Sequence, residues 1–189
     1  QELSRCTYHA VFDINYKEKF ENGTNESSFV ASDDFITRDS SVSSIVVEGV
    51  KPGESPSLTT IWTQIGYPNT TIALPLWVAG GEKIPSVLAY DKEIKNSPLN
   101  KLALEWREKC YPLTRADGYH YLKLDELINQ HNTGLMQRIE PVEKKIFDKT
   151  DNLLAKWANK TPDTSEISSL YNWLDNIVIE FYNNAKSDL

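Results

Sequence analysis

The chain has 189 residues, which is enough for one domain with a sizeable hydrophobic core. Hydrophobic residues make up 40% of it and charged residues 25%, a globular composition that argues against global disorder. The formal net charge of −7, without any run of Lys and Arg, argues against a nucleic-acid surface. No apolar run approaches the roughly 20 residues that a membrane-spanning helix needs.

Residues 1–37 show no strong periodicity and are interpreted as an N-terminal segment. Short polar connections at 51–57 and 66–69 predict that the strands on either side of them pair antiparallel. Both faces of these strands carry large apolar side chains, so we expect both faces of the sheet to be covered. Pro75 cannot donate a ladder hydrogen bond and is expected at a sheet edge or a bulge. The three strands, rich in Val, Ile and Trp, are predicted at 43–50, 58–65 and 70–78.

Helical patterns dominate the second half of the chain. Ser97 is the expected N-cap of a helix whose first residue is Pro98. Thr164 or Ser165 is expected to cap the last helix, which repeats apolar residues at i, i+3, i+4 and i+7 more regularly than any other segment. The predicted helices lie at 97–110, 122–130, 139–158 and 164–186.

Strands followed by helices predict an α+β fold. We expect a single domain, 1–189, with strands at 38–90 and a mainly helical part at 97–186. A sheet covered on both faces is typical of a layered sandwich, with helices, two sheets and helices in sequence. The segment before Ser43 is too short to supply a second full sheet, so we expect part of the fold to come from outside this chain.

Arg38 stands beside a cluster of serines at the start of the first predicted strand: Ser40, Ser41, Ser43 and Ser44. Hydroxyl groups and a guanidinium at a strand end are suited to orienting a carbonyl or a carboxylate. A solvated loop with turn-forming serines explains the same residues. Both interpretations remain open at this stage.

Other nucleophile and metal patterns are weak. The threonine pairs at 59–60 and 70–71 fall in strands, where Thr stabilises a sheet, and no adjacent base is visible. The three histidines have no metal-ligand spacing, so neither a metal nor a cofactor is predicted. Cys6 follows Arg5, but one arginine is too little to lower a thiol pKa, and we interpret Cys6 as noncatalytic. Whether Cys6 and Cys110 form a disulfide is left open.

One run is distinctive: DFITRDSSVSSIVVEGVKPGESPSLTTIWTQIGYPNTTIALPLWVAGGEKIP, at 34–85. Its features are Arg38 with the serine cluster, EGVKPGE, LTTIWTQIGYP, and Pro75 with Trp77. In these it resembles the later strands of a bacterial branch of linear amide C–N hydrolases. That branch includes penicillin acyltransferase-like and choloylglycine hydrolase-like proteins, which are N-terminal-nucleophile (Ntn) hydrolases. The resemblance extends more loosely over 30–185.

The resemblance implies an αββα sandwich without cofactor, in which a cysteine unmasked by autoprocessing attacks a small amide substrate. It also implies that strand ends border the acyl pocket, at Arg38, Ser40, Ser41, Ser43, Thr60 and Trp62. This sequence departs from the family because Gln1 is its first residue and Cys6 lies inside it. We therefore expect a C-terminal portion, inactive alone, whose partner is a nucleophile-bearing N-terminal chain or segment of the same precursor.

The resemblance to this family also implies a periplasmic or exported location. The sequence does not identify the substrate. It also does not determine the oligomeric state, and a homo-oligomer is one of the possibilities. The alternative is a noncatalytic extracytoplasmic binding domain, in which some of the five Trp and nine Tyr stack against a sugar or a peptide. Most of these aromatic residues recur within apolar stripes, which favours core packing.

Overall fold

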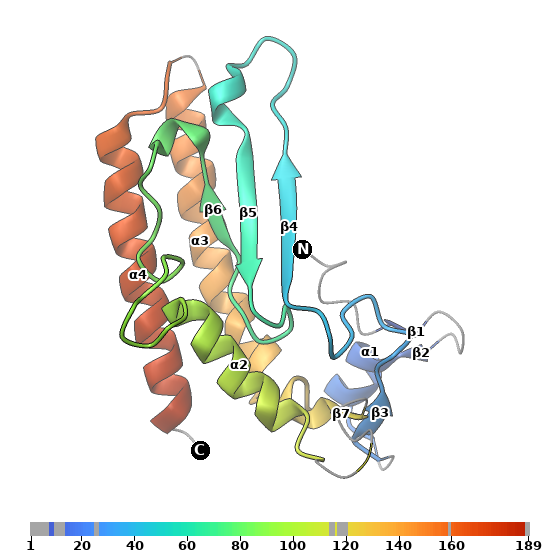
Figure 1. Ribbon diagram of the computed structural model, residues 1–189. Helices are drawn as coiled ribbons and strands as arrows, with labels where there is room; N and C mark the ends of the chain where they lie inside the picture. Colours follow the sequence, from blue (N-terminus) through green and yellow to red (C-terminus); the bar gives the residue numbers. More distant parts are fainter. Residues whose placement is uncertain are drawn as a thin grey trace.

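The computed structural model describes residues 8–9, 14–24, 27–113, 116, 121–158 and 160–187. The predicted α+β class is confirmed, with antiparallel sheets in the first half of the chain and long helices in the second. Figure 1 shows the elements: β1 (Tyr8–His9), β2 (Ile14–Asn15), α1 (Tyr16–Glu21), β3 (Phe29–Ala31), β4 (Ser43–Glu48), β5 (Thr60–Ile65), β6 (Leu74–Leu76), α2 (Pro98–Cys110), β7 (Tyr121–Lys123), α3 (Leu135–Trp157) and α4 (Thr164–Ser187).

The largest described sheet is an antiparallel meander with the strand order β4-β5-β6. The predicted pairing of consecutive strands is confirmed, although the strands are shorter than expected. The turn between β4 and β5 contains Gly53, whose φ of +93° lies in the left-handed region that favours glycine. Pro75 lies opposite Trp62 in β6, which is an edge strand, as predicted.

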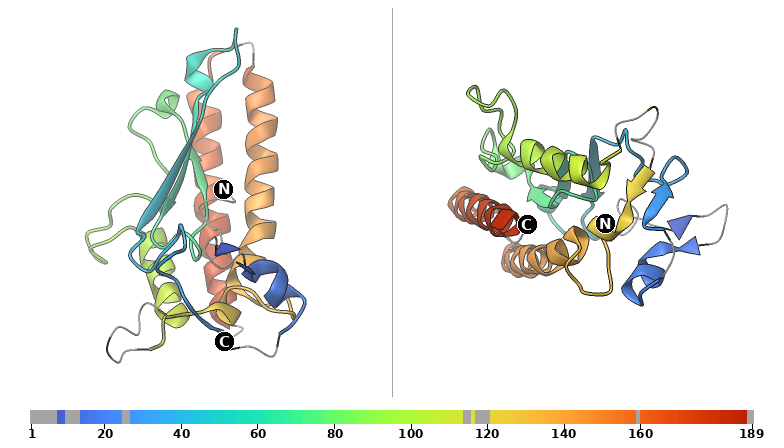
Figure 2. Two further views of the ribbon diagram at one scale, coloured as in Figure 1. Left: turned by 90° about the vertical axis from the view of Figure 1, so that its right-hand side faces the viewer. Right: turned by 90° about the horizontal axis from the view of Figure 1, so that it is seen from below.

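The two long helices, α3 and α4, lie together on one side of this sheet (Figures 1 and 2). Along β5, the buried side chains Thr60, Trp62 and Gln64 alternate with half-buried ones. The Trp62 ring meets Phe147 of α3 edge-on, with ring centroids 4.6 Å apart. This contact, together with the hydrogen bond between Trp77 and Thr60, assigns Trp62 and Thr60 to the helix-covered face.

The opposite face of the sheet is covered only in part. α2 lies on this side, near the end of the sheet where β4 begins (Figure 2). On β4, the side chains of Ile45 and Val47 are 63% and 62% exposed. The expectation that both faces are covered is therefore wrong for the described part of the chain. The physical reason is that α2 reaches only the end of the sheet where β4 begins, so the apolar side chains farther along this face of β4 meet solvent.

Trp77, directly after β6, joins the sheet to both long helices. Its ring packs edge-on against Trp157 of α3 at 5.5 Å and stacks on Tyr171 of α4 at 6.4 Å, measured between ring centroids. Its indole N–H donates to the hydroxyl of Thr60 on β5, and its backbone N–H donates to the Tyr171 hydroxyl. All four side chains are buried, or nearly so, so one residue fixes the spacing of four elements.

Local caps set the helix boundaries. Ser97 caps α2 by accepting a backbone N–H of the first turn, and Pro98 is the first helical residue, as predicted. α4 begins at Thr164, but its cap is Asp163, whose carboxylate accepts the N–H of Ser165 at 2.8 Å. The predicted cap was therefore wrong by one residue, because Asp fills this role as well as Ser or Thr does.

The helix predicted at 122–130 is wrong. Residues Tyr121–Lys123 form β7, which pairs antiparallel with β3 (Phe29–Ala31), and a 3₁₀ turn follows at Leu124–Glu126. A strand partner far away in the sequence has overridden a local helical pattern. α3 also begins at Leu135, earlier than predicted.

A buried set of hydroxyl groups ties β3 to the main sheet. The Tyr67 hydroxyl lies 3.0 Å from that of Tyr111, which donates to the Ser32 hydroxyl at 3.1 Å. Asn69 donates its side-chain amide to the Tyr67 hydroxyl. Burial raises the pKa of Tyr67 well above its ordinary value, so this phenol stays neutral and acts as a hydrogen-bonding group.

One cluster of buried apolar side chains extends from Phe20 in α1 to Ala185 in α4. α1, β3, the three-stranded sheet and the long helices therefore share a core.

Gly66 follows β5 directly, at a position where any larger residue is expected to destabilise the fold. Its φ is +90°, and a Cβ atom there would lie 2.7 Å from the Cβ of Ala103 on α2. We expect Gly66→Ala to lower the free energy of unfolding by about 3 kcal/mol, because backbone strain and a steric clash add. Urea denaturation of the purified chain measures this change.

Gly53→Ala is the matched control. Gly53 has a similar φ of +93° but no atom within 4 Å of the added Cβ, so the expected loss is about 1 kcal/mol. Equal losses in the two variants would contradict a tight approach between the β5 turn and α2.

Candidate functional site

A hollow of about 480 Å³ lies on the partly open face of the sheet, where β4 begins, β5 ends and α2 passes. We call it the β4–α2 hollow. Its lining is mostly apolar, with hydroxyl and amide groups among the apolar side chains. The lining residues are Val42, Ser43, Ile45, Thr63, Gln64, Ile65, Asn100 and Leu104.

The strand ends beside the hollow are held by backbone pairing. Ser43 lies opposite Ile65, and Ile45 lies opposite Thr63, so their side chains share one face of the sheet. The Gly66 N–H donates to the Val42 carbonyl at 2.9 Å, which extends the pairing past the last ladder residues. The side chains of this corner therefore stand on a fixed backbone.

The loop that carries Arg38 is anchored to α2. Both Nε and Nη2 of Arg107 donate to the Asp39 carbonyl, at 3.0 and 2.7 Å, and the Ser41 N–H donates to the Arg38 carbonyl. Arg38 itself is exposed, as is Ser40. This loop therefore has a defined position next to the hollow, and of the predicted pocket residues only Ser43 lines it.

Thr60 and Trp62 lie on the other, helix-covered face. The Thr60 hydroxyl donates to the Leu58 carbonyl and accepts from the Trp77 indole. The Trp62 indole donates to the Glu48 carboxylate at 3.0 Å. The structure thus separates these two from Ser43, because Ser43 lies opposite Ile65 and successive residues of a strand point to opposite faces.

Two cysteines were candidates for chemistry or for a disulfide. Cys6 lies outside the described residues. Cys110 ends α2 as a fully buried free thiol. Burial, with a smaller contribution from the Glu126 carboxylate, raises the pKa of this thiol far above its ordinary value. A thiol that does not ionise is a poor nucleophile, so Cys110 serves as a core residue.

The described residues hold no group of three His, Cys, Asp or Glu side chains that could bind a metal ion. Among the described helices, none combines the length and the apolar character needed to cross a bilayer. The β4–α2 hollow can hold an apolar ligand group against the sheet. The hydroxyl groups of its lining can form hydrogen bonds with a polar group of the same ligand.

Sequence reasoning missed the contribution of α2. Asn100 and Leu104 are half-buried residues of a helix that the sequence predicts from Ser97 and Pro98 at its start, which do not indicate the face that it turns to the sheet. The available signal was Gly66, since a glycine directly after a strand marks a close approach of another element.

No protein-family model matches this chain, and neither any curated protein nor any solved structure matches it.

Cys110 should be inert in the folded protein. In a Cys6→Ser variant, we expect iodoacetamide to leave Cys110 unmodified under native conditions and to modify it once urea unfolds the chain. The reason is that the thiol is buried and its raised pKa keeps it protonated. Mass spectrometry of the alkylated protein measures the extent of reaction. Rapid modification in native buffer would show that Cys110, at the C-terminal end of α2, is accessible to solvent and would contradict this prediction.

Proposed function

We propose that this chain supplies one helix-covered sheet of an αββα sandwich in an Ntn-type amide hydrolase or acyltransferase. The reaction is cleavage of a linear, non-peptide amide C–N bond, or transfer of its acyl group, through a cysteine acyl-enzyme. The nucleophilic cysteine is proposed to stand at the N-terminus of a segment outside these 189 residues. The sequence resemblance motivates this proposal, and the architecture is compatible with it.

The observation that carries the proposal is the exposed apolar strand β4. Native proteins protect edge strands with charges, prolines, bulges or covering elements, because bare edges pair with other chains. The six residues of β4 contain no Lys or Pro, and Ile45, Val46 and Val47 are all exposed. Val42, just before it, is 70% exposed. Ile45 and Val47 lie opposite Thr63 and Ile61 on the open face of the sheet, whereas Val46 lies opposite Trp62 on the helix side. A second sheet packed on the open face would bury Ile45 and Val47.

The β4–α2 hollow supports the assignment of an acyl pocket. It is apolar along Ile45, Ile65 and Leu104, as a site for a hydrocarbon acyl group requires. Ser43 at its rim provides a hydroxyl for the amide carbonyl, and the exposed Arg38 on the adjoining loop provides a charge for a carboxylate. The role of this chain in the reaction is to bind and orient the substrate.

In the proposed reaction, the α-amine of the N-terminal cysteine accepts the thiol proton, and the sulfur attacks the amide carbonyl. Hydrogen-bond donors stabilise the oxyanion, and the amine leaves with a proton. Water, or an acceptor amine in acyl transfer, then releases the acyl group and restores the thiol. A periplasmic or exported bacterial location belongs to the same proposal and rests on family habit alone.

The noncatalytic binding domain is the weaker candidate. Trp62, Trp77, Trp106 and Trp157 are all buried, so they cannot offer a flat stacking surface to a sugar or a peptide. Trp173 is half-buried and its ring is covered by the Lys149 ammonium at 4.4 Å.

The proposal predicts a partner. Mass spectrometry of the protein isolated from its native source should reveal a co-purifying chain that begins with Cys. The complex should hydrolyse members of a panel of N-acyl amides, while the 189-residue chain alone should not. A Val47→Lys substitution should abolish association and activity, because a buried charge would face the second sheet.

Ile179→Lys, on the exposed side of α4, is the matched control and should leave association unchanged. The unfolding free energy of each isolated variant verifies that the chain still folds. Turnover by the 189-residue chain that disappears in Cys6→Ala would instead make Cys6 the nucleophile. Association that survives Val47→Lys would rule out β4 as the contact.

A further inference from the structure

A second, more polar pocket of about 430 Å³ lies away from the sheet, between α2 and the segment that leads from β7 into α3. Carboxylate, guanidinium, amide and hydroxyl groups line it, so it differs in character from the β4–α2 hollow. The lining residues that matter here are Trp106, Asp125, Asn129, Asn132, Thr133 and Arg138.

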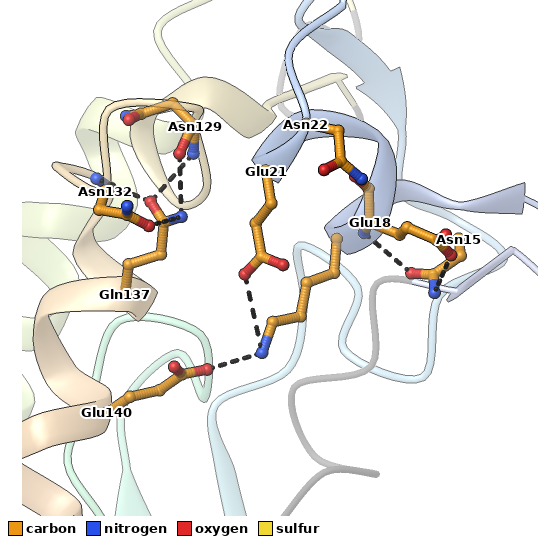
Figure 3. A network of polar contacts seen from close by, with 10 residues as sticks. Asn15, Glu18, Glu21, Asn22, Asn129, Asn132, Gln137 and Glu140 are labelled. Atoms are coloured by element: carbon orange, nitrogen blue, oxygen red, sulfur yellow. Dashed lines mark hydrogen bonds and ion pairs between the residues drawn. The ribbon is translucent and has the colours of Figure 1, made fainter.

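The loop that forms one wall is crosslinked by side-chain amides (Figure 3). The Gln137 amide nitrogen donates to the Asn129 carbonyl at 2.9 Å and to the Asn132 side chain at 3.1 Å. The Gln137 amide oxygen accepts the backbone N–H groups of Asn129 and Gly134. The Asn129 side chain accepts both the N–H and the hydroxyl of Thr133. A wall bonded in this way is preorganised, as binding sites require.

Two polar groups of the lining residues lack partners in the described structure. Trp106 is only 3% exposed, and its indole N–H has no hydrogen-bond acceptor. One carboxylate oxygen of Asp125 is also buried without a donor. Leaving such groups unpaired is costly, most of all for a charged one. By contrast, the indole N–H groups of Trp62, Trp77 and Trp157 all donate to an oxygen.

The charges at this pocket have both signs. Glu126 is bonded to the Lys123 ammonium at 2.6 Å, so the carboxylate left for a ligand is that of Asp125. Arg138 brings a positive charge from the first turn of α3. The Lys109 ammonium lies over the Trp106 ring, 4.3 Å from the ring centroid, so one face of the ring already has a partner whereas its N–H does not.

We propose that this pocket binds a free α-amino acid. The ligand ammonium donates to the unpaired oxygen of Asp125, and the ligand carboxylate accepts from the Trp106 indole and faces Arg138. A ligand with only a negative charge would be repelled by the Asp125 carboxylate, and a ligand with only a positive charge would be repelled by Arg138. A zwitterion, which carries both charges, therefore matches the lining best. The volume leaves room for a side chain beyond these two groups.

The inference does not depend on the proposed amide chemistry. The two pockets share no lining residue: on α2, Trp106 lines the polar pocket, whereas Asn100 and Leu104 line the β4–α2 hollow. The proposed binding can be tested on the 189-residue chain alone, without a nucleophile-bearing partner.

The test is a ¹H–¹⁵N spectrum of the chain, in which the five tryptophans each contribute an indole signal. Trp106→Phe identifies the Trp106 signal by its disappearance. Glycine, L-alanine, L-glutamine, L-leucine and L-phenylalanine are then added in turn. We expect at least one to shift the Trp106 signal with saturation, while the hydrogen-bonded Trp62 and Trp157 signals stay in place. Propionate and propylamine, which each lack one charge, should bind more weakly.

Asp125→Asn should weaken binding about tenfold or more, because it removes the charge that pairs with the ammonium but keeps the side-chain shape. Asp151→Asn, at an exposed position of α3, is the matched control and should have no effect. The urea midpoint of each variant shows that the fold is retained. If no amino acid shifts the Trp106 signal at about 10 mM, the pocket holds water only and the proposal is wrong. Equal weakening by both Asp variants would also overturn it.

Discussion

The packing around Trp77 is the constraint on which the rest of the structure depends. This side chain follows the edge strand β6, bonds to Thr60 on β5, and meets Trp157 and Tyr171 on the two long helices. Large aromatic rings bury much area and pack in few geometries, so they fix distances between elements well. The contacts of Trp77 fix the position of α3 and α4 relative to the sheet. As a result, the face of β5 that carries Thr60 and Trp62 lies against the helices.

That one-sided attachment determines which surfaces are free for function. On the helix-covered face, Trp62 and Thr60 are buried against groups of the long helices and Trp77. The other face keeps the β4–α2 hollow and the exposed side chains of Ile45 and Val47 on β4. An apolar strand edge is a liability for a protein on its own, so its presence is best explained by a second layer that packs there. The amide-hydrolase proposal is motivated by the sequence resemblance, and this geometry is compatible with it.

The candidate site was predictable in part. The serine cluster was noticed because hydroxyls gather at the start of a strand, and Ser43 does line the hollow. The same prediction includes Thr60 and Trp62, although the register places them on the opposite face of the sheet from Ser43. The polar pocket beside Trp106 left no motif in the sequence, because its residues come from segments that only packing brings together.

The sequence by itself determined the elements whose signals are local. Ser97 and Pro98 set the start of α2, the period of apolar residues set α4, and the polar turns set the antiparallel meander. Only the tertiary structure decided that Tyr121–Lys123 is a strand, since its partner at Phe29–Ala31 lies far away in the chain. It also decided which sheet face is covered. Local backbone preferences are weak compared with the free energy of burying distant apolar surfaces together, so these choices were made by packing.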